Sequence, residues 1–152
     1  MQATQLRLRL ILVALVLCLQ PVHRANAAEA AAKITWRILR GLNYKTGEQT
    51  SELKKLNGTV TKIPGFMVPL EDDNEKVSEF LLVPYVGACV HTPPPPPNQI
   101  VHVKMLANKK VKISFWEPVW VEGKLEIGRV KSPYGEVSYS VTGTSVEAYK
   151  EN

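Results

Sequence analysis

From Gly58 onward the sequence is a succession of short β-type runs separated by turn residues, and this pattern constrains the fold more than any other feature. β-Branched and apolar residues fill the runs, while proline, glycine, asparagine and serine fall between them. The pattern predicts a turn at Pro64-Gly65 and strands at residues 59–63, 66–70, 80–86, 100–105, 110–113, 119–127 and 137–149.

The segment before Gly58 predicts helix instead. Ile34, Ile38 and Leu42 recur at helical spacing, which indicates a short amphipathic helix within residues 29–42. Thr50 or Ser51 can cap a further short helical turn.

Many short strands with few helices predict an all-β domain. A small barrel limits the number of exposed strand edges in a domain of this length. We expect a partly open barrel of about five or six strands, of the oligonucleotide/oligosaccharide-binding (OB) type, with the short N-terminal helix packed on one end. A β-sandwich is the alternative. Neither fold specifies a function, because such barrels hold unrelated ligands.

The first 27 residues have the pattern of a secretory signal peptide. Arg7 and Arg9 precede an apolar run at residues 10–19, and Ala25-Asn26-Ala27 supplies small residues for cleavage. The apolar run is about half of the roughly twenty residues that a membrane-spanning helix needs. We therefore expect a cleaved signal at residues 1–27, a single domain at residues 28–152 without a transmembrane segment, and a periplasmic location.

Removing the signal also removes most of the positive charge. The full chain has 19 Lys and Arg against 14 Asp and Glu; without Arg7, Arg9 and Arg24 the balance is 16 against 14, a net charge of +2. The remaining lysine pairs, Lys54-Lys55 and Lys109-Lys110, are short and isolated. Charge therefore gives little support for nucleic-acid binding.

The segment from Gly87 to Gln99 combines a thiol, an imidazole and five consecutive prolines. Cys89 and His91 are two residues apart, so on an extended strand their side chains point to the same side. Cys18 leaves with the signal, and Cys89 is then unable to form an internal disulfide. Two explanations stay open for Cys89: a small buried hydrophobic residue, or a metal ligand or reactive thiol beside His91. The prolines form a polyproline II rod, which we expect to fix a loop rather than to recruit a partner.

A third ligand is predicted from the hairpin that spans the proline run. A suitable antiparallel register brings Cys89 opposite His102. Cys89, His91 and His102 then share one face and form a candidate site for zinc or copper, since both metals accept thiolate sulfur and imidazole nitrogen. Met67 is a candidate for a further copper ligand, whereas Met105 is expected on the face opposite to His102.

These assignments have alternatives. His102 is otherwise an ordinary exposed strand histidine, because a slip of one residue sends it to the other face, and His91 serves equally well to anchor the loop by hydrogen bonds. A catalytic Cys–His pair is a further class. Asn98 is a weak candidate for its orienting group, and side chains that point in parallel from a strand make a poor hydrogen bond. We therefore expect a binding protein without catalytic residues rather than an enzyme.

Several of these segments also carry a family resemblance. They are GFMVPLE at residues 65–71, FLLVPYVGACVH at residues 80–91, the proline run with Asn98-Gln99-Ile100-Val101, and PVWVEG at residues 118–123. They resemble a family of exported Gram-negative proteins known only as domain of unknown function 3299. The resemblance runs from about Ile34 to the C-terminus.

The resemblance implies a setting rather than an activity. Members of that family are often encoded beside an ABC-type ATPase and a permease similar to lipoprotein-release or macrolide-efflux systems, in settings linked to zinc limitation. Together with the ligand chemistry of Cys89 and His91, this predicts a periplasmic accessory or binding protein of an ABC-type transport system that binds zinc or another transition metal. The alternative is a structural adaptor without a metal site, whose loop at residues 87–100 docks a permease ectodomain.

Overall fold

The computed structural model describes residues 31–72, 75–88 and 94–150, so the proposed signal peptide lies outside the described residues. The elements in chain order are β1 (Ala32–Lys33), α2 (Trp36–Leu39), α3 (Ser51–Lys54), β2 (Val60–Pro69), β3 (Lys76–Val77), β4 (Glu79–Val83), η1 (Pro97–Gln99), β5 (Val101–Met105), η2 (Leu106–Asn108), β6 (Val111–Lys112), β7 (Val119–Ser132) and β8 (Gly135–Ala148). Within the described ranges no helix is long and apolar enough to cross a membrane.

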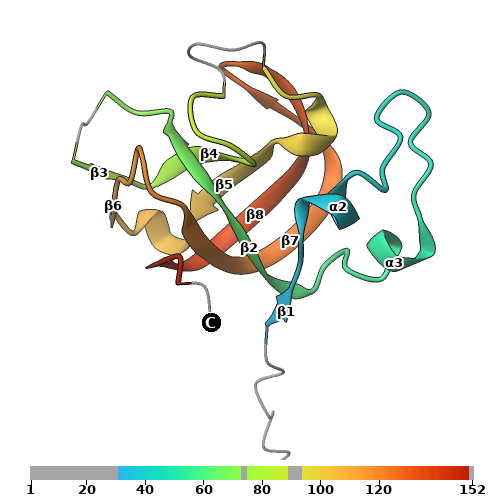
Figure 1. The fold of residues 1–152 in the computed structure, drawn as a ribbon, viewed down its shortest axis with the longest axis horizontal. Coiled ribbons are helices and arrows are strands. Elements are labelled where there is room, and N and C mark those ends of the chain that lie inside the picture. The colour runs from blue at the N-terminus through green and yellow to red at the C-terminus, as the bar shows by residue number, and fades with distance from the viewer. Residues whose placement is uncertain (1–30, 73–74, 89–93, 151–152) are drawn as a thin grey trace, which may run out of the picture.

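Strands β2, β4, β5, β8 and β7 form a closed ring of hydrogen-bonded neighbours (Figure 1). β2, β4 and β5 follow one another as an antiparallel meander, β5 pairs with β8 in parallel, and β8 pairs with β7, which returns to β2. A meander followed by a hairpin that closes the ring in this way is the OB-type arrangement. The predicted all-β barrel with a short N-terminal helix is therefore confirmed.

The predicted turn at Pro64-Gly65 is wrong, because β2 runs through both residues. Up to Gly65 the strand pairs with β7, and from Phe66 it pairs with β4. A Cβ atom at Gly65 would lie 2.8 Å from Leu82 Cγ and 2.8 Å from the carbonyl oxygen of Val83. The missing side chain thus allows a close approach of the strands, and Pro-Gly marks the place where β2 changes its partner.

The N-terminal helix is much shorter than the predicted residues 29–42. The backbone N–H of Ile34 donates to the carbonyl of Lys62 at 3.0 Å, next to the short β1–β2 pairing, so this part of the segment is extended. Ile34 and Leu42 are nevertheless buried, as their spacing indicated. The second helical turn is confirmed as α3, whose N-cap Thr50 accepts a hydrogen bond from the Leu53 N–H at 3.3 Å.

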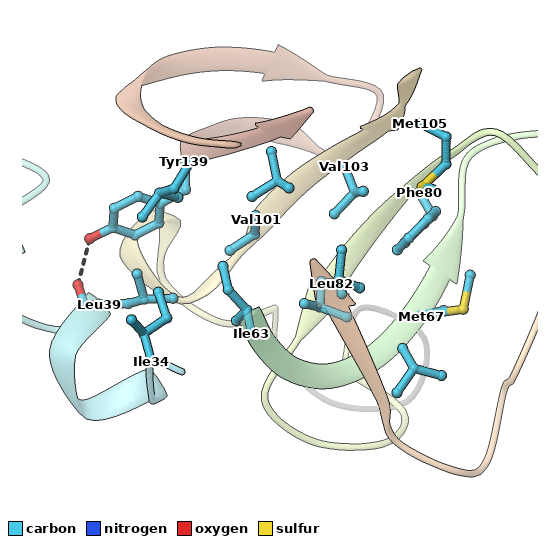
Figure 2. Packing of buried hydrophobic residues seen from close by; sticks show 14 of the residues in the cluster. Ile34, Leu39, Ile63, Met67, Phe80, Leu82, Val101, Val103, Met105 and Tyr139 are labelled. Carbon is cyan, nitrogen blue, oxygen red and sulfur yellow. Dashed lines mark hydrogen bonds between the residues drawn. The ribbon is translucent and has the colours of Figure 1, made fainter. Parts of the chain in front are cut away.

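Two hydrogen bonds join α2 to the barrel. The indole Nε1–H of Trp36 donates to the carbonyl of Pro64 at 2.7 Å. The hydroxyl of Tyr139, which is fully buried, donates to the carbonyl of Leu39 at 2.6 Å (Figure 2). The short helix is therefore fixed against the barrel by specific polar contacts as well as by apolar packing.

Apolar residues form clusters on both faces of the barrel wall. The main core, inside the ring, takes alternate residues of each strand, among them Ile63, Met67, Phe80, Leu82, Val101, Val103 and Met105 (Figure 2). The second cluster contains intervening residues of β2 and β4, namely Val68, Leu81 and Val83, together with Ala88, Ile100 and Val137. The connection between β4 and β5 and the start of β8 therefore cover part of the outer face of β2 and β4.

Glu71 holds the connection between β2 and β4. Its carboxylate accepts hydrogen bonds from the backbone N–H of Ser78 at 2.6 Å, the hydroxyl of Ser78 at 2.9 Å and the N–H of Glu79 at 2.9 Å, and it pairs with Lys110. The Lys110 ammonium, followed by the Ser78 N–H, lowers the pKa of Glu71 to about 2, because these contacts favour the charged carboxylate.

Candidate functional site

Of the three predicted metal ligands, only His102 lies among the described residues; Cys89 and His91 lie outside them. Ala88, the residue before Cys89, is fully buried in the outer cluster. His102 is in the middle of β5. In the described part of the chain, no three His, Cys, Asp or Glu residues form a group that could hold a metal ion.

The position of His102 corrects the predicted hairpin register. His102 lies opposite Leu81 on β4 and opposite Ser140 on β8, so Leu81 occupies the place that the prediction gave to Cys89. The prediction failed because β4 ends at Val83, just before Pro84, and does not extend to Cys89. The strand that pairs with β5 is therefore an earlier part of the chain than the prediction used.

A carboxylate contacts the imidazole of His102. Its Nε2 lies 2.7 Å from Oε1 of Glu79, and the His102 side chain is only 13% exposed. Glu79 is the diagonal neighbour of His102 across β4 and β5. A neutral imidazole that donates Nε2–H to this carboxylate has its lone pair on Nδ1. His102 is therefore an oriented, carboxylate-supported imidazole and not an ordinary exposed strand histidine.

The two methionines considered beside this histidine both face the barrel interior. Met105 lies in the main core, opposite in face to His102, which confirms that prediction. Met67 also lies in the main core and is 3% exposed. Met67 pairs with Leu82, whereas His102 pairs with Leu81 on the other face of β4. Met67 is therefore not placed to share a ligand with His102.

The end of the proline run is anchored to the N-terminal segment. Pro96 has φ −62° and ψ 157°, the polyproline II conformation, and leads into η1. Asn98 Nδ2 donates to the carbonyl of Leu42 at 2.8 Å, and Gln99 Nε2 donates to the carbonyl of Trp36 at 3.2 Å. Asn98 thus has a structural role, and its buried Oδ1 has no hydrogen-bond partner among the described residues.

The surface also carries an apolar groove with a volume of about 340 Å³. Its lining comes from the end of β2, the end of β4 and three loops. We call it the aromatic groove, and it is lined by Phe66, Met67, Val68, Pro69, Val83, Val86, Gly87, Ala88, Phe115, Trp116 and Tyr134. It has the size of a small-ligand site.

Local hydrogen bonds present the aromatic residues of this groove. The Ser114 hydroxyl donates to the Glu117 carbonyl at 2.8 Å across the turn that carries Phe115 and Trp116. The Ser132 hydroxyl donates to the carbonyl of Gly135 at 2.8 Å across the β7–β8 turn, which carries Tyr134.

The groove exposes large apolar surface together with polar atoms. Trp116 is 78% exposed, Tyr134 is 53% exposed and Phe115 is 44% exposed. Among the described residues, Trp116 and Tyr134 have no hydrogen-bond partner. A groove that offers aromatic faces with an indole N–H and a hydroxyl, both unpaired within the described ranges, suits an apolar ligand with hydrogen-bond acceptors. The sequence signal for it was the aromatic pair Phe115-Trp116 in a loop between two predicted strands, a signal on which none of the predicted sites was based.

Comparisons with known proteins place these features in a family context. The family model of DUF3299, described as a protein of unknown function, matches residues 23–148. A solved structure of a DUF3299 family protein from Pseudomonas aeruginosa PAO1 superimposes with a TM-score of 0.63 and 28% sequence identity, over 81% of this chain and 99% of that chain. A search of curated proteins finds no match.

Proposed function

Because this chain belongs to the DUF3299 family of proteins of unknown function, we propose its role from its own geometry: it is a non-enzymatic, periplasmic adaptor that binds an extended apolar segment of a partner protein in the aromatic groove. The observation that carries this proposal is the 78% exposure of Trp116 at the edge of an apolar groove. Clustered exposed apolar residues of this kind mark interaction sites in soluble proteins.

The polar atoms of the groove favour a peptide over a purely hydrocarbon ligand. An extended peptide has backbone carbonyl groups that accept hydrogen bonds along its length. The indole N–H of Trp116 and the hydroxyl of Tyr134 are donors without partners among the described residues. Tryptophan and tyrosine also dominate the binding energy of many protein interfaces.

The proposed partner is the exported part of an ABC-type permease, with the protein acting as an accessory of that transport system. Support for this partner comes from the family resemblance alone. The groove extends the adaptor hypothesis, because Gly87 and Ala88, at the start of the loop proposed to dock the permease, line it.

The proposal is tested by measuring the affinity of the purified protein for the purified exported domain of a permease from an ABC-type system of this kind. We expect Trp116→Ala to weaken binding by roughly thirtyfold, the effect of an interface hot spot of about 2 kcal/mol. Leu106→Ala is the matched control, because Leu106 is 59% exposed but does not line the groove. Equal binding by Trp116→Ala and the unsubstituted protein would exclude the groove as the docking site.

Metal binding is a second candidate function, favoured by the contact between His102 and Glu79. A carboxylate behind a histidine orients the ring and raises the basicity of the nitrogen that binds the metal. The described residues provide one such imidazole, and the proposed zinc or copper site needs Cys89 and His91 in addition. Cys89→Ser and His102→Ala should each abolish stoichiometric zinc binding in equilibrium dialysis of the reduced protein. Little binding by the unsubstituted protein, with a native thiol inaccessible to alkylating reagents, would favour the adaptor without a metal site.

A further inference from the structure

A second hollow on the outside of the barrel is lined mainly by lysines. It shares no lining residue with the aromatic groove. We call it the basic hollow; it has a volume of about 490 Å³ and is lined by Lys33, Lys62, Trp120, Glu147, Ala148 and Lys150. Three lysines and one glutamate give the lining a net formal charge of +2. The lysines come from β1, from β2 and from the residues after β8, so the fold brings them together from distant parts of the sequence.

The strand register sets two of these lysines side by side. Lys33 and Lys62 are directly opposite each other in the parallel β1–β2 pair. Like charges in this position destabilise a sheet, so the arrangement favours an anion between them. Glu147 neutralises only one lysine, because its Oε2 lies 2.7 Å from the Lys62 ammonium. Glu122, opposite Lys62 on β7, does not line the hollow.

An aromatic wall completes the hollow. The ring of Trp120 stacks on Tyr149 with centroids 5.2 Å apart, and the Lys33 ammonium lies 5.6 Å from the Trp120 centroid. The cation–π contact holds the Lys33 side chain at the edge of the hollow. The Lys62 side chain is only 19% exposed, so its ammonium is held in place by packing and by Glu147.

We propose that the basic hollow binds a phosphate group carried by a larger molecule, either a soluble phosphate ester or the headgroup of an anionic phospholipid. Lysine ammonium groups bind phosphate as point charges. A bare anion would not fill a hollow of about 490 Å³, which lies within the usual range of small-molecule sites. The indole of Trp120 and the methyl group of Ala148 supply apolar surface for the rest of the ligand. This site is independent of the aromatic groove.

The test measures binding of the purified protein to three probes: glycerol phosphate, vesicles of phosphatidylcholine alone, and vesicles that also contain phosphatidylglycerol. Saturable binding of glycerol phosphate supports a soluble ester, and binding to the anionic vesicles alone supports a lipid headgroup. Lys33→Gln and Lys150→Gln should each weaken the observed binding roughly tenfold, as expected for a charged hydrogen bond. Glu147→Gln should strengthen it, because a competing carboxylate is removed.

Lys55→Gln is the matched control, since it removes the same charge from an exposed residue outside the hollow. Its binding should equal that of the unsubstituted protein. Equal weakening by Lys55→Gln and Lys33→Gln would show a general charge effect and overturn the proposal. Absence of binding to glycerol phosphate, combined with absence of any preference for anionic over neutral vesicles, would overturn it as well.

Discussion

Replacing Gly123 with alanine should strongly destabilise the barrel at the point where β7 and β8 lie closest. Gly123 pairs with Gly143, next to a shift in the register of the two strands. A Cβ atom at Gly123 would lie 2.3 Å from the Thr142 carbonyl oxygen, 2.7 Å from Val141 Cγ1 and 2.8 Å from Gly143 Cα. Real Cβ atoms essentially never approach another atom closer than 3.0 Å.

The size of the effect follows from which atoms must move. The difference between 2.3 Å and 3.0 Å requires a shift of at least 0.7 Å, and two of the three contacts are with the backbone of β8. Overpacking costs about 1–3 kcal/mol, and we expect the upper end of this range because a hydrogen-bonded strand cannot rotate away like a side chain. With a urea m-value of about 2 kcal/mol/M, a loss of about 3 kcal/mol lowers the unfolding midpoint by about 1.5 M.

Gly128→Ala is the matched control on the same strand. A Cβ atom at Gly128 would have no heavy atom within 4 Å, and its backbone is outside the left-handed region. This substitution should leave stability unchanged or raise it by up to about 1 kcal/mol, because alanine restricts the unfolded chain. The comparison is between the urea unfolding midpoints of the two variants, which report stability as long as their m-values are equal. A Gly123→Ala midpoint equal to that of Gly128→Ala would refute the steric reasoning.

Three further predictions concern named contacts. Tyr139→Phe should lower the free energy of unfolding by about 1–2 kcal/mol in urea titration, because the Leu39 carbonyl loses its buried donor; an unchanged midpoint would contradict this. The pKa of Glu71 is lowered from 4.5 to about 2, so its stabilising contribution is complete above pH 4.5 and is lost as the pH falls toward 2. The difference in free energy of unfolding between Glu71→Gln and the unsubstituted protein should therefore shrink as the pH falls from 4.5 toward 2. A difference that stays constant would exclude the ion pair with Lys110 as the cause of this stability difference. Trp116→Ala should change the free energy of unfolding by less than about 0.5 kcal/mol, because the indole is 78% exposed, and a larger loss would mean that Trp116 supports the fold.

The strands were predictable from the sequence because their side chains alternate between two environments. In β7, Val119, Val121 and Leu125 are buried on one face while Lys124 and Glu126 are exposed on the other. Glycine also suits the start of β8, because Gly135 has φ 110°, a backbone conformation that glycine adopts without strain. These are local properties, and local chemistry is what a single sequence reports.

Pairing between distant strands was not predictable in the same way. The parallel contact of β5 with β8 joins residues far apart in the chain, so no turn signals it. A Pro-Gly pair is compatible both with a turn and with a continuous strand. Only the close approach of Gly65 to Leu82 on β4 shows that this pair lies within a strand. Similarly, the start of the N-terminal segment forms the strand β1 because it pairs with β2. The helical spacing of apolar residues in this segment gives no sign of that pairing.

For the candidate sites too, local properties were predictable from the sequence, whereas contacts between distant segments were not. Alternation along β5 correctly put His102 and Met105 on opposite faces. The partner of His102 was missed, because Glu79 reaches it diagonally across β4 once the register is known. The aromatic groove is formed where loops near Val86, Trp116 and Tyr134 meet in space. These loops are far apart in the chain, so no repeat or motif in the sequence indicates that they meet.

The parallel pairing of β5 with β8 makes β8 responsible for the integrity of the whole barrel wall, because β8 joins β5 to β7. Without β8, the strands β2, β4 and β5 would form an open sheet in which one edge of β5 has no partner strand. Loss of residues 135–148 would therefore leave β5 and β7 each with an unpaired strand edge. Such edges are templates for association with other chains.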